Sequence, residues 1–70
     1  MKRNTIIKQI GNEHLNLYSA PGYLYFAYDD GENYHTHSVM VDNLSHMTIE
    51  QWVGEGKIFL TNLKHEYGIE

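Results

Sequence analysis

Hydrophobic and polar residues alternate along the first two thirds of the chain in the pattern typical of β-strands. The segment His14 to Ser19 places Leu15 and Leu17 on one side and polar residues or tyrosine on the other. The segment Tyr23 to Tyr28 is aromatic or apolar throughout, as expected of a strand with little exposure on either face. A third alternating segment, Tyr34 to Val41, completes a set of three strands.

Short turn sequences separate these strands. The first is Ala20 to Gly22, where proline fixes φ and glycine permits a positive φ. The second contains Asp30-Gly31, a pair that two-residue hairpin turns favour. Because links this short join neighbouring strands that run in opposite directions, the sequence predicts an antiparallel meander.

A further strand is predicted near the N-terminus, over Thr5 to Ile10. In this interpretation Ile6 and Ile10 lie on one side of the strand and Ile7 lies on the other, before a turn at "GNE". The sheet would then have three or four strands.

The last third of the chain has helical periodicity. Thr48 fits an N-cap, and Gln51 stands three residues later as its capping-box partner. Gly68 suits the position just after the last turn. Apolar residues recur at steps of three, four and seven, which predicts an amphipathic helix laid on the sheet; they are Ile49, Trp52, Val53, Leu60, Leu63 and Tyr67.

Two glycines interrupt this helix, at Gly54 and Gly56. Each costs about 1 kcal/mol in a helix interior. Either the helix is continuous and Gly56 permits a close approach to the sheet, or it breaks at Gly54–Gly56; the continuous helix is preferred. The fold class predicted for residues 1–70 is a single small α+β domain, with an antiparallel meander of three or four strands and one C-terminal helix packed on one face.

The pleat of the central strand places alternate residues on opposite faces of the sheet. If Leu24 and Phe26 face the helix, Tyr23 and Tyr25 face the opposite side. A turn at Asp30-Gly31 sets the register of the next strand: Tyr25 lies opposite Thr36, and Tyr23 lies opposite Ser38. In this register two valines and two histidines lie on the helix side of the sheet; they are Val39, Val41, His35 and His37.

An uncovered sheet face rich in tyrosine and poor in charge is typical of the centre of a protein-binding surface. The acidic hairpin beside it would form a rim. The partner-binding residues predicted on this basis are Tyr18, Tyr23, Tyr25 and Tyr34, with Asp29, Asp30 and Glu32 as the rim.

Composition narrows the choice of partner. Five Lys and Arg stand against nine Asp and Glu, for a formal net charge of −4, and there is no cysteine. The charge disfavours direct binding of nucleic acid, which needs clustered cations. The lack of cysteine excludes disulfides and thiolate metal sites. An acidic surface can instead meet a basic protein, and proteins that handle nucleic acid are typically basic.

The function predicted is that of a non-catalytic protein-binding module without a cofactor. It would be a small inhibitor or modulator, of the kind found in phages and mobile elements, that blocks a site on a larger protein, such as one that handles nucleic acid. Self-association into a homodimer is expected as well. No nucleophile–base arrangement with an orienting third group is evident, and a chain of 70 residues hardly encloses a catalytic cleft.

The alternative function is metal binding. His35 and His37 are two residues apart on a strand, so both imidazoles project from the same face about 7 Å apart. His14, on a neighbouring strand, could supply a third ligand, and a zinc site needs three or four.

Neither a signal peptide nor a membrane span is predicted. A signal peptide needs an uninterrupted apolar stretch of about 7–15 residues, and a membrane helix needs about 20; the sequence has neither. A cytoplasmic location is therefore expected by elimination.

Overall fold

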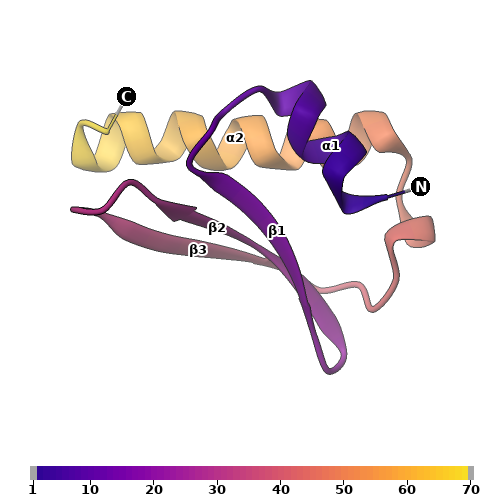
Figure 1. Cartoon of the computed structure of the whole chain (residues 1–70). Coiled ribbons are helices and arrows are strands. Elements are labelled where there is room, and N and C mark those ends of the chain that lie inside the picture. The colour runs from indigo at the N-terminus through magenta and orange to yellow at the C-terminus, as the bar shows by residue number, and fades with distance from the viewer. Residues whose placement is uncertain (1, 70) are drawn as a thin grey trace.

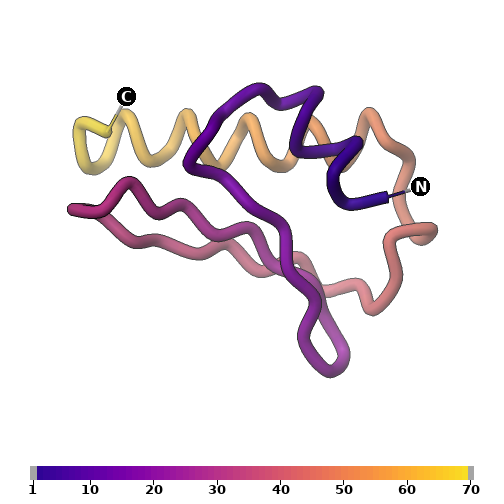
Figure 2. Tube along the Cα trace, in the orientation of Figure 1, coloured from indigo at the N-terminus to yellow at the C-terminus, as the bar shows by residue number. Residues whose placement is uncertain are grey.

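The structure is a computed structural model in which residues 2–69 are described. These residues form two α-helices, three strands and one short 3₁₀ helix, arranged as Figure 1 shows. Their bounds in chain order are α1 (Arg3–Ile10), β1 (Leu15–Ala20), β2 (Tyr23–Asp29), β3 (Tyr34–Val39), η1 (Leu44–His46) and α2 (Ile49–Tyr67). The trace in Figure 2 shows α1 and α2 on the same side of the sheet.

The three strands form the predicted antiparallel meander, in the order β1-β2-β3. Gly22 has a φ of 84° in the β1–β2 turn, and Gly31 has a φ of 91° in the β2–β3 loop, both in the left-handed region that glycine adopts without a steric penalty. These two glycines therefore lie in the connections that precede and follow β2, as the turn sequences indicate.

The β2–β3 loop is longer than the two-residue turn that Asp30-Gly31 predicts. Its strands pair from Asp29 and Tyr34, so four residues lie between them. Tyr25 is consequently opposite Ser38, not Thr36. Because the register moves by two residues and side chains alternate with a period of two, every side chain keeps its predicted face.

The strand predicted over Thr5 to Ile10 is wrong, because this segment is helix α1. Ile6, Ile7 and Ile10 are spaced by one, three and four residues, which fits one side of a helix as well as it fits a strand. Burial decides between the two: Ile6 is fully buried, and Ile7 and Ile10 pack against the core. Gly11, with a φ of 80°, ends the helix and donates its N–H to the Ile7 carbonyl.

Helix α2 runs without a break from Ile49 to Tyr67 and has the predicted ends. The Thr48 hydroxyl accepts a hydrogen bond from the Gln51 N–H, and the Gln51 side chain accepts one from the Thr48 N–H. Gly68 closes the helix in the left-handed conformation. The predicted continuous helix is therefore confirmed, with the capping box that its sequence indicates.

One side of α2 packs on one face of the sheet. Trp52 is fully buried with its ring 6.2 Å from that of Phe26 on β2, and its Nε1 donates to the Leu44 carbonyl at 2.8 Å. Further along the helix, Phe59 stacks on His37 of β3 with centroids 5.5 Å apart. Phe59 belongs to the buried stripe, although the sequence interpretation left it out. Tyr67, a predicted member of the stripe, is 57% exposed.

Gly56 lies where α1, α2 and the sheet meet. A Cβ placed on this residue would overlap the Ile10 Cδ1 atom of α1 and would lie 3.2 Å from Phe26 Cε1 of β2. Gly54, two residues earlier, has open space at the same position. The two glycines of the "GEG" sequence therefore differ: the Gly56 site is closely packed on both sides and the Gly54 site is not.

We predict opposite effects of substitution at these two glycines. Gly54→Ala should raise the free energy of unfolding by up to about 1 kcal/mol, because alanine favours the helix and meets no neighbour. Gly56→Val should lower it by about 1–3 kcal/mol, because the larger side chain must displace Ile10 and Phe26. Urea denaturation followed by Trp52 fluorescence measures both; a neutral or stabilising Gly56→Val would contradict the packing described.

Candidate protein-binding surface

The sheet has one covered face and one open face. On β2, Leu24, Phe26 and Tyr28 point towards α2 and are almost fully buried. Because successive side chains of a strand alternate, the residues between them lie on the opposite face of the sheet. Both helices lie on the Leu24 side (Figure 1). We call this side the open face; across the three strands it consists of Asn16, Tyr18, Ala20, Tyr23, Tyr25, Ala27, Asp29, Tyr34, Thr36 and Ser38.

Three of the four predicted tyrosines form one cluster on the open face. Tyr18 and Tyr25 are direct cross-strand partners, with ring centroids 5.6 Å apart. Tyr23 is two residues from Tyr25 on the same strand, at 6.1 Å. Tyr18 is 43% exposed, and the rings of Tyr23 and Tyr25 are partly exposed. The register of β1 on β2 thus assembles one aromatic surface, which we call the tyrosine cluster.

Tyr34 lies at the other end of the open face. It is opposite Asp29 at the hairpin end and is 63% exposed. Ala27 and Thr36 lie between this pair and the tyrosine cluster in the register of the sheet. Asp29 is the only charged residue of the open face as defined above. The structure therefore brings the predicted tyrosines onto one face, as a cluster of three and a separate fourth member.

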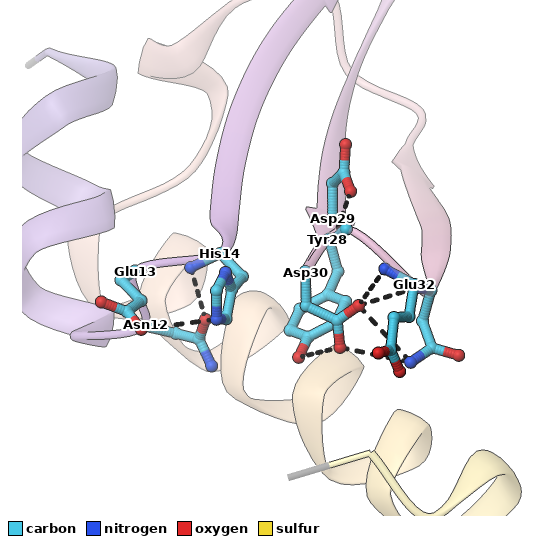
Figure 3. A network of polar contacts seen from close by, with 9 residues as sticks. Asn12, Glu13, His14, Tyr28, Asp29, Asp30 and Glu32 are labelled. Atoms are coloured by element: carbon cyan, nitrogen blue, oxygen red, sulfur yellow. Dashed lines mark hydrogen bonds and ion pairs between the residues drawn. The ribbon is translucent and has the colours of Figure 1, made fainter.

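The acidic hairpin is organised by its own hydrogen bonds (Figure 3). Asp30 Oδ1 accepts from the backbone N–H groups of Glu32 at 3.0 Å and Asn33 at 2.7 Å, and Asp29 Oδ1 accepts from the Gly31 N–H at 2.9 Å. The Tyr28 hydroxyl donates to Asp30 Oδ2 at 3.2 Å. Two of the three predicted rim residues thus hold the loop as well as carrying charge, and Glu32 remains an exposed acid beside them.

These contacts shift two pKa values. The hydrogen bonds from the Asn33 and Glu32 backbone lower the pKa of Asp30 from 3.8 to about 2, because they favour the ionised carboxylate. Burial raises the pKa of the Tyr28 hydroxyl, and its hydrogen bond to Asp30 and the charge of that carboxylate raise it further. Asp30 is therefore a fixed negative charge at the tip of the hairpin at any pH near neutrality.

The three histidines of the alternative metal site have separate partners. His14 meets the Tyr28 ring edge-on at 5.8 Å, and His35 stacks on Tyr67 at 4.2 Å. His37 Nε2 lies 3.0 Å from Glu55 Oε2. Within residues 2–69, no three His, Asp or Glu side chains are grouped so that they could hold a metal ion. His35 and His37 do share the α2 side of the sheet, as their strand spacing predicts.

The pairing of His37 with Glu55 was missed at the level of sequence. The two residues are 18 positions apart and lie on different elements, so no local pattern relates them. The stacking of His35 on Tyr67 likewise depends on how α2 crosses β3. Both contacts join α2 to β3 on the covered side of the sheet.

A hollow of about 410 Å³ lies away from the open face. It is bordered by the end of α2, the α1–β1 turn and one residue of β2, and its lining residues are Asn12, Tyr28, Leu60, Thr61, Leu63, Lys64 and Ile69. None of the residues predicted to bind a partner lines it. The candidate surface is therefore the open face of the sheet, distinct from this hollow. A smaller hollow of about 200 Å³, between α1 and β1, includes Asn16 and Tyr18 of the open face among its lining residues.

Comparisons with known proteins give no relative for this chain: no protein family model, no curated protein sequence and no solved structure matches it. Neither helix described between residues 2 and 69 combines the length and the apolar character that crossing a membrane requires.

We predict that the hairpin makes stability depend on acid. The folded-state pKa of Asp30 is about 2, below its ordinary value of 3.8. Its ionised form therefore stabilises the fold above about pH 4, and this contribution disappears as the pH falls through about 2. Wild-type protein should lose more stability between pH 5 and pH 2 than Asp30→Asn, which cannot ionise.

Glu32→Gln is the matched control, since it removes a neighbouring negative charge whose side chain makes none of these bonds. Thermal unfolding followed by circular dichroism across this pH range measures the difference. An acid dependence that Glu32→Gln removes and Asp30→Asn retains would contradict the assignment.

Proposed function

We propose that this chain is a non-catalytic protein-binding module and that the open face is its binding surface. The observation that carries the proposal is the tyrosine cluster of Tyr18, Tyr23 and Tyr25, held together on a face that neither helix covers. Tyrosine offers a large contact area at a low cost in conformational entropy, together with a hydroxyl that can form hydrogen bonds. Such residues dominate the energetics of protein interfaces.

The surroundings of the cluster support the same function. Its neighbours on the open face are small or polar and uncharged, including Asn16, Ala20 and Ser38. Burying them against a partner removes no isolated charge from water, a cost that is large for lysine or glutamate. Charged residues are depleted at the centre of interfaces for this reason. The cluster thus has the composition of an interface centre.

The acidic hairpin indicates the charge of the partner. Asp29, Asp30 and Glu32 lie together at one end of the open face, and the chain as a whole carries a formal charge of −4. A target with a basic surface would be attracted and oriented by this end. Proteins that handle nucleic acid present such surfaces, so the proposed action is to cover one of them. A small acidic inhibitor of the phage or mobile-element type is the class that this combination suggests.

We predict that Tyr25→Ala weakens partner binding at least tenfold, or by about 1.4 kcal/mol, because Tyr25 contacts both other members of the cluster. The partner is first captured from host lysate on immobilised wild-type protein and identified. The purified partner is then titrated with each variant by calorimetry, with circular dichroism confirming the fold.

Tyr67→Ala is the matched control, because Tyr67 is also an exposed tyrosine but lies on α2, on the covered side of the sheet. It should bind as the wild type does. Equal binding by Tyr25→Ala, or a selective loss in Tyr67→Ala, would contradict the open face as the binding surface.

A further inference from the structure

Within residues 2–69, strand β3 forms an edge of the sheet and pairs with no element other than β2. At the opposite edge of the sheet, β1 has α1 beside it, and residues of both elements border one hollow. The six residues of β3, "YHTHSV", contain no proline, lysine or acidic residue, and their register with β2 has no bulge. Proteins use proline, charged side chains and bulges to protect sheet edges from pairing with another chain. Strand β3 has none of these three features.

The hydrogen bonds at the hairpin show which backbone groups of this edge are free. Asp29 donates its N–H to His14 on the β1 side, and Asp30 donates to Asn33 on the β3 side. Successive residues of a strand direct their N–H and C=O groups to opposite sides. On β2, the groups of Tyr28 and Phe26 therefore point to β3, where they meet those of the register partners His35 and His37.

The residues of β3 that alternate with His35 and His37 direct both backbone groups away from β2. They are Tyr34, Thr36 and Ser38, which also carry their side chains on the open face. Among residues 2–69, no backbone hydrogen bond joins these groups to a segment outside the sheet. The edge thus presents three evenly spaced N–H and C=O pairs to solvent.

We propose that this edge binds β3 of a second copy of the chain, with the strands antiparallel and a two-fold axis through Thr36. Tyr34 and Ser38 are each two residues from Thr36, so the free groups are arranged symmetrically about it. In this register Thr36 lies opposite Thr36 of the second copy, and each Tyr34 lies opposite a Ser38. All twelve outward groups, six from each strand, then pair in six hydrogen bonds. The edge is therefore complementary to itself.

The same register keeps the two faces of the sheet continuous. Residues opposite each other in an antiparallel pair lie on the same face, so the open faces of the two copies join across six strands. The tyrosine clusters of both copies then lie on one side, and α2 of each copy lies on the other. On that other side, His35 is opposite His37 of the second copy. No Lys, Arg, Asp or Glu in β3 opposes a like charge in its copy.

This inference goes beyond the binding of a different protein and does not depend on it. The dimer uses the backbone of the β3 edge, whereas the proposed partner surface is centred on the side chains of the tyrosine cluster, which lie on β1 and β2. Tyr25→Ala should therefore leave the dimer intact, and loss of the dimer need not remove the tyrosine cluster. The two proposals can fail separately.

The register is tested by single cysteines in a chain that has none. In Thr36→Cys, the two cysteines are directly opposite, with Cα atoms about 5.5 Å apart, within the range that a disulfide spans. In Ser38→Cys, on the same strand and face, they are separated by four residues, or about 13 Å along the strand. Under mild oxidation, Thr36→Cys should form the disulfide-linked dimer at least tenfold faster than Ser38→Cys.

Oligomeric state is measured on the unmodified chain by sedimentation equilibrium. The expected result is a reversible species of twice the 8.2 kDa chain mass. Thr36→Pro should shift this species to the monomer, because proline has no backbone N–H to donate to the second copy. The bonds between β3 and β2 are unaffected, because the Thr36 N–H points away from β2. Circular dichroism checks the fold of this variant, and the cysteine pair decides the matter if it does not fold.

A single 8.2 kDa species at millimolar concentration would overturn the proposal. So would a dimer in which Ser38→Cys cross-links as fast as Thr36→Cys, since the contact would then lie elsewhere or in another register. A monomer whose Thr36→Pro variant loses a captured protein would assign the edge to a strand of that protein, which also contradicts a second copy as the occupant.

Discussion

The packing of α2 on one face of the sheet determines the rest of the structure. Phe26 and Trp52 meet at the centre of this contact, and Gly56 allows the helix to approach both β2 and α1 closely. A sheet of three strands is marginal alone and needs an apolar face packed on another element. Helix α2 supplies that element on one side of the sheet only. Because successive side chains of a strand alternate, every second residue of β2 therefore lies on the side away from α2.

The candidate binding surface follows from this commitment. Leu24, Phe26 and Tyr28 are buried against α2, so Tyr23 and Tyr25 must face away from it. Their clustering with Tyr18 depends further on the β1–β2 register, which the short turn at Pro21 and Gly22 fixes. In the described part of the chain, the same tight connections leave β3 at the edge of the sheet, paired on one side only. The tyrosine cluster and the β3 edge are thus two consequences of a small sheet covered on one side.

The parts of the fold that depend on local signals could be predicted from the sequence. The capping box at Thr48, the left-handed Gly68 and the apolar stripe fix the bounds of α2, and the two turn sequences fix the meander. The segment of α1 was misread because three isoleucines in eight residues have a strand-like composition. The burial of Ile6 in the core and the packing of Ile10 at Gly56 of α2 join distant parts of the chain and decide in favour of the helix.

The details of the site divide in the same way. The face of the sheet that each tyrosine occupies follows from the two-residue period of a strand. These faces are as predicted even though the observed register differs from the predicted one, because the difference is two residues. The four-residue loop could not be predicted from Asp30-Gly31, because Asp30 accepts backbone hydrogen bonds from Glu32 and Asn33 and so stabilises a wider turn. The contact of His37 with Glu55 depends on how α2 crosses β3, which no local pattern encodes.

The separation of the two faces is tested most directly by NMR with a soluble paramagnetic probe, which broadens the signals of protons in contact with solvent. Tyr25 and Phe26 are adjacent in sequence and are assigned to opposite faces. The ring protons of Tyr25 and Tyr18 should broaden strongly, while those of Phe26 and Tyr28 stay sharp. Equal protection of Tyr25 and Phe26, or stronger broadening at Phe26, would contradict the open tyrosine face.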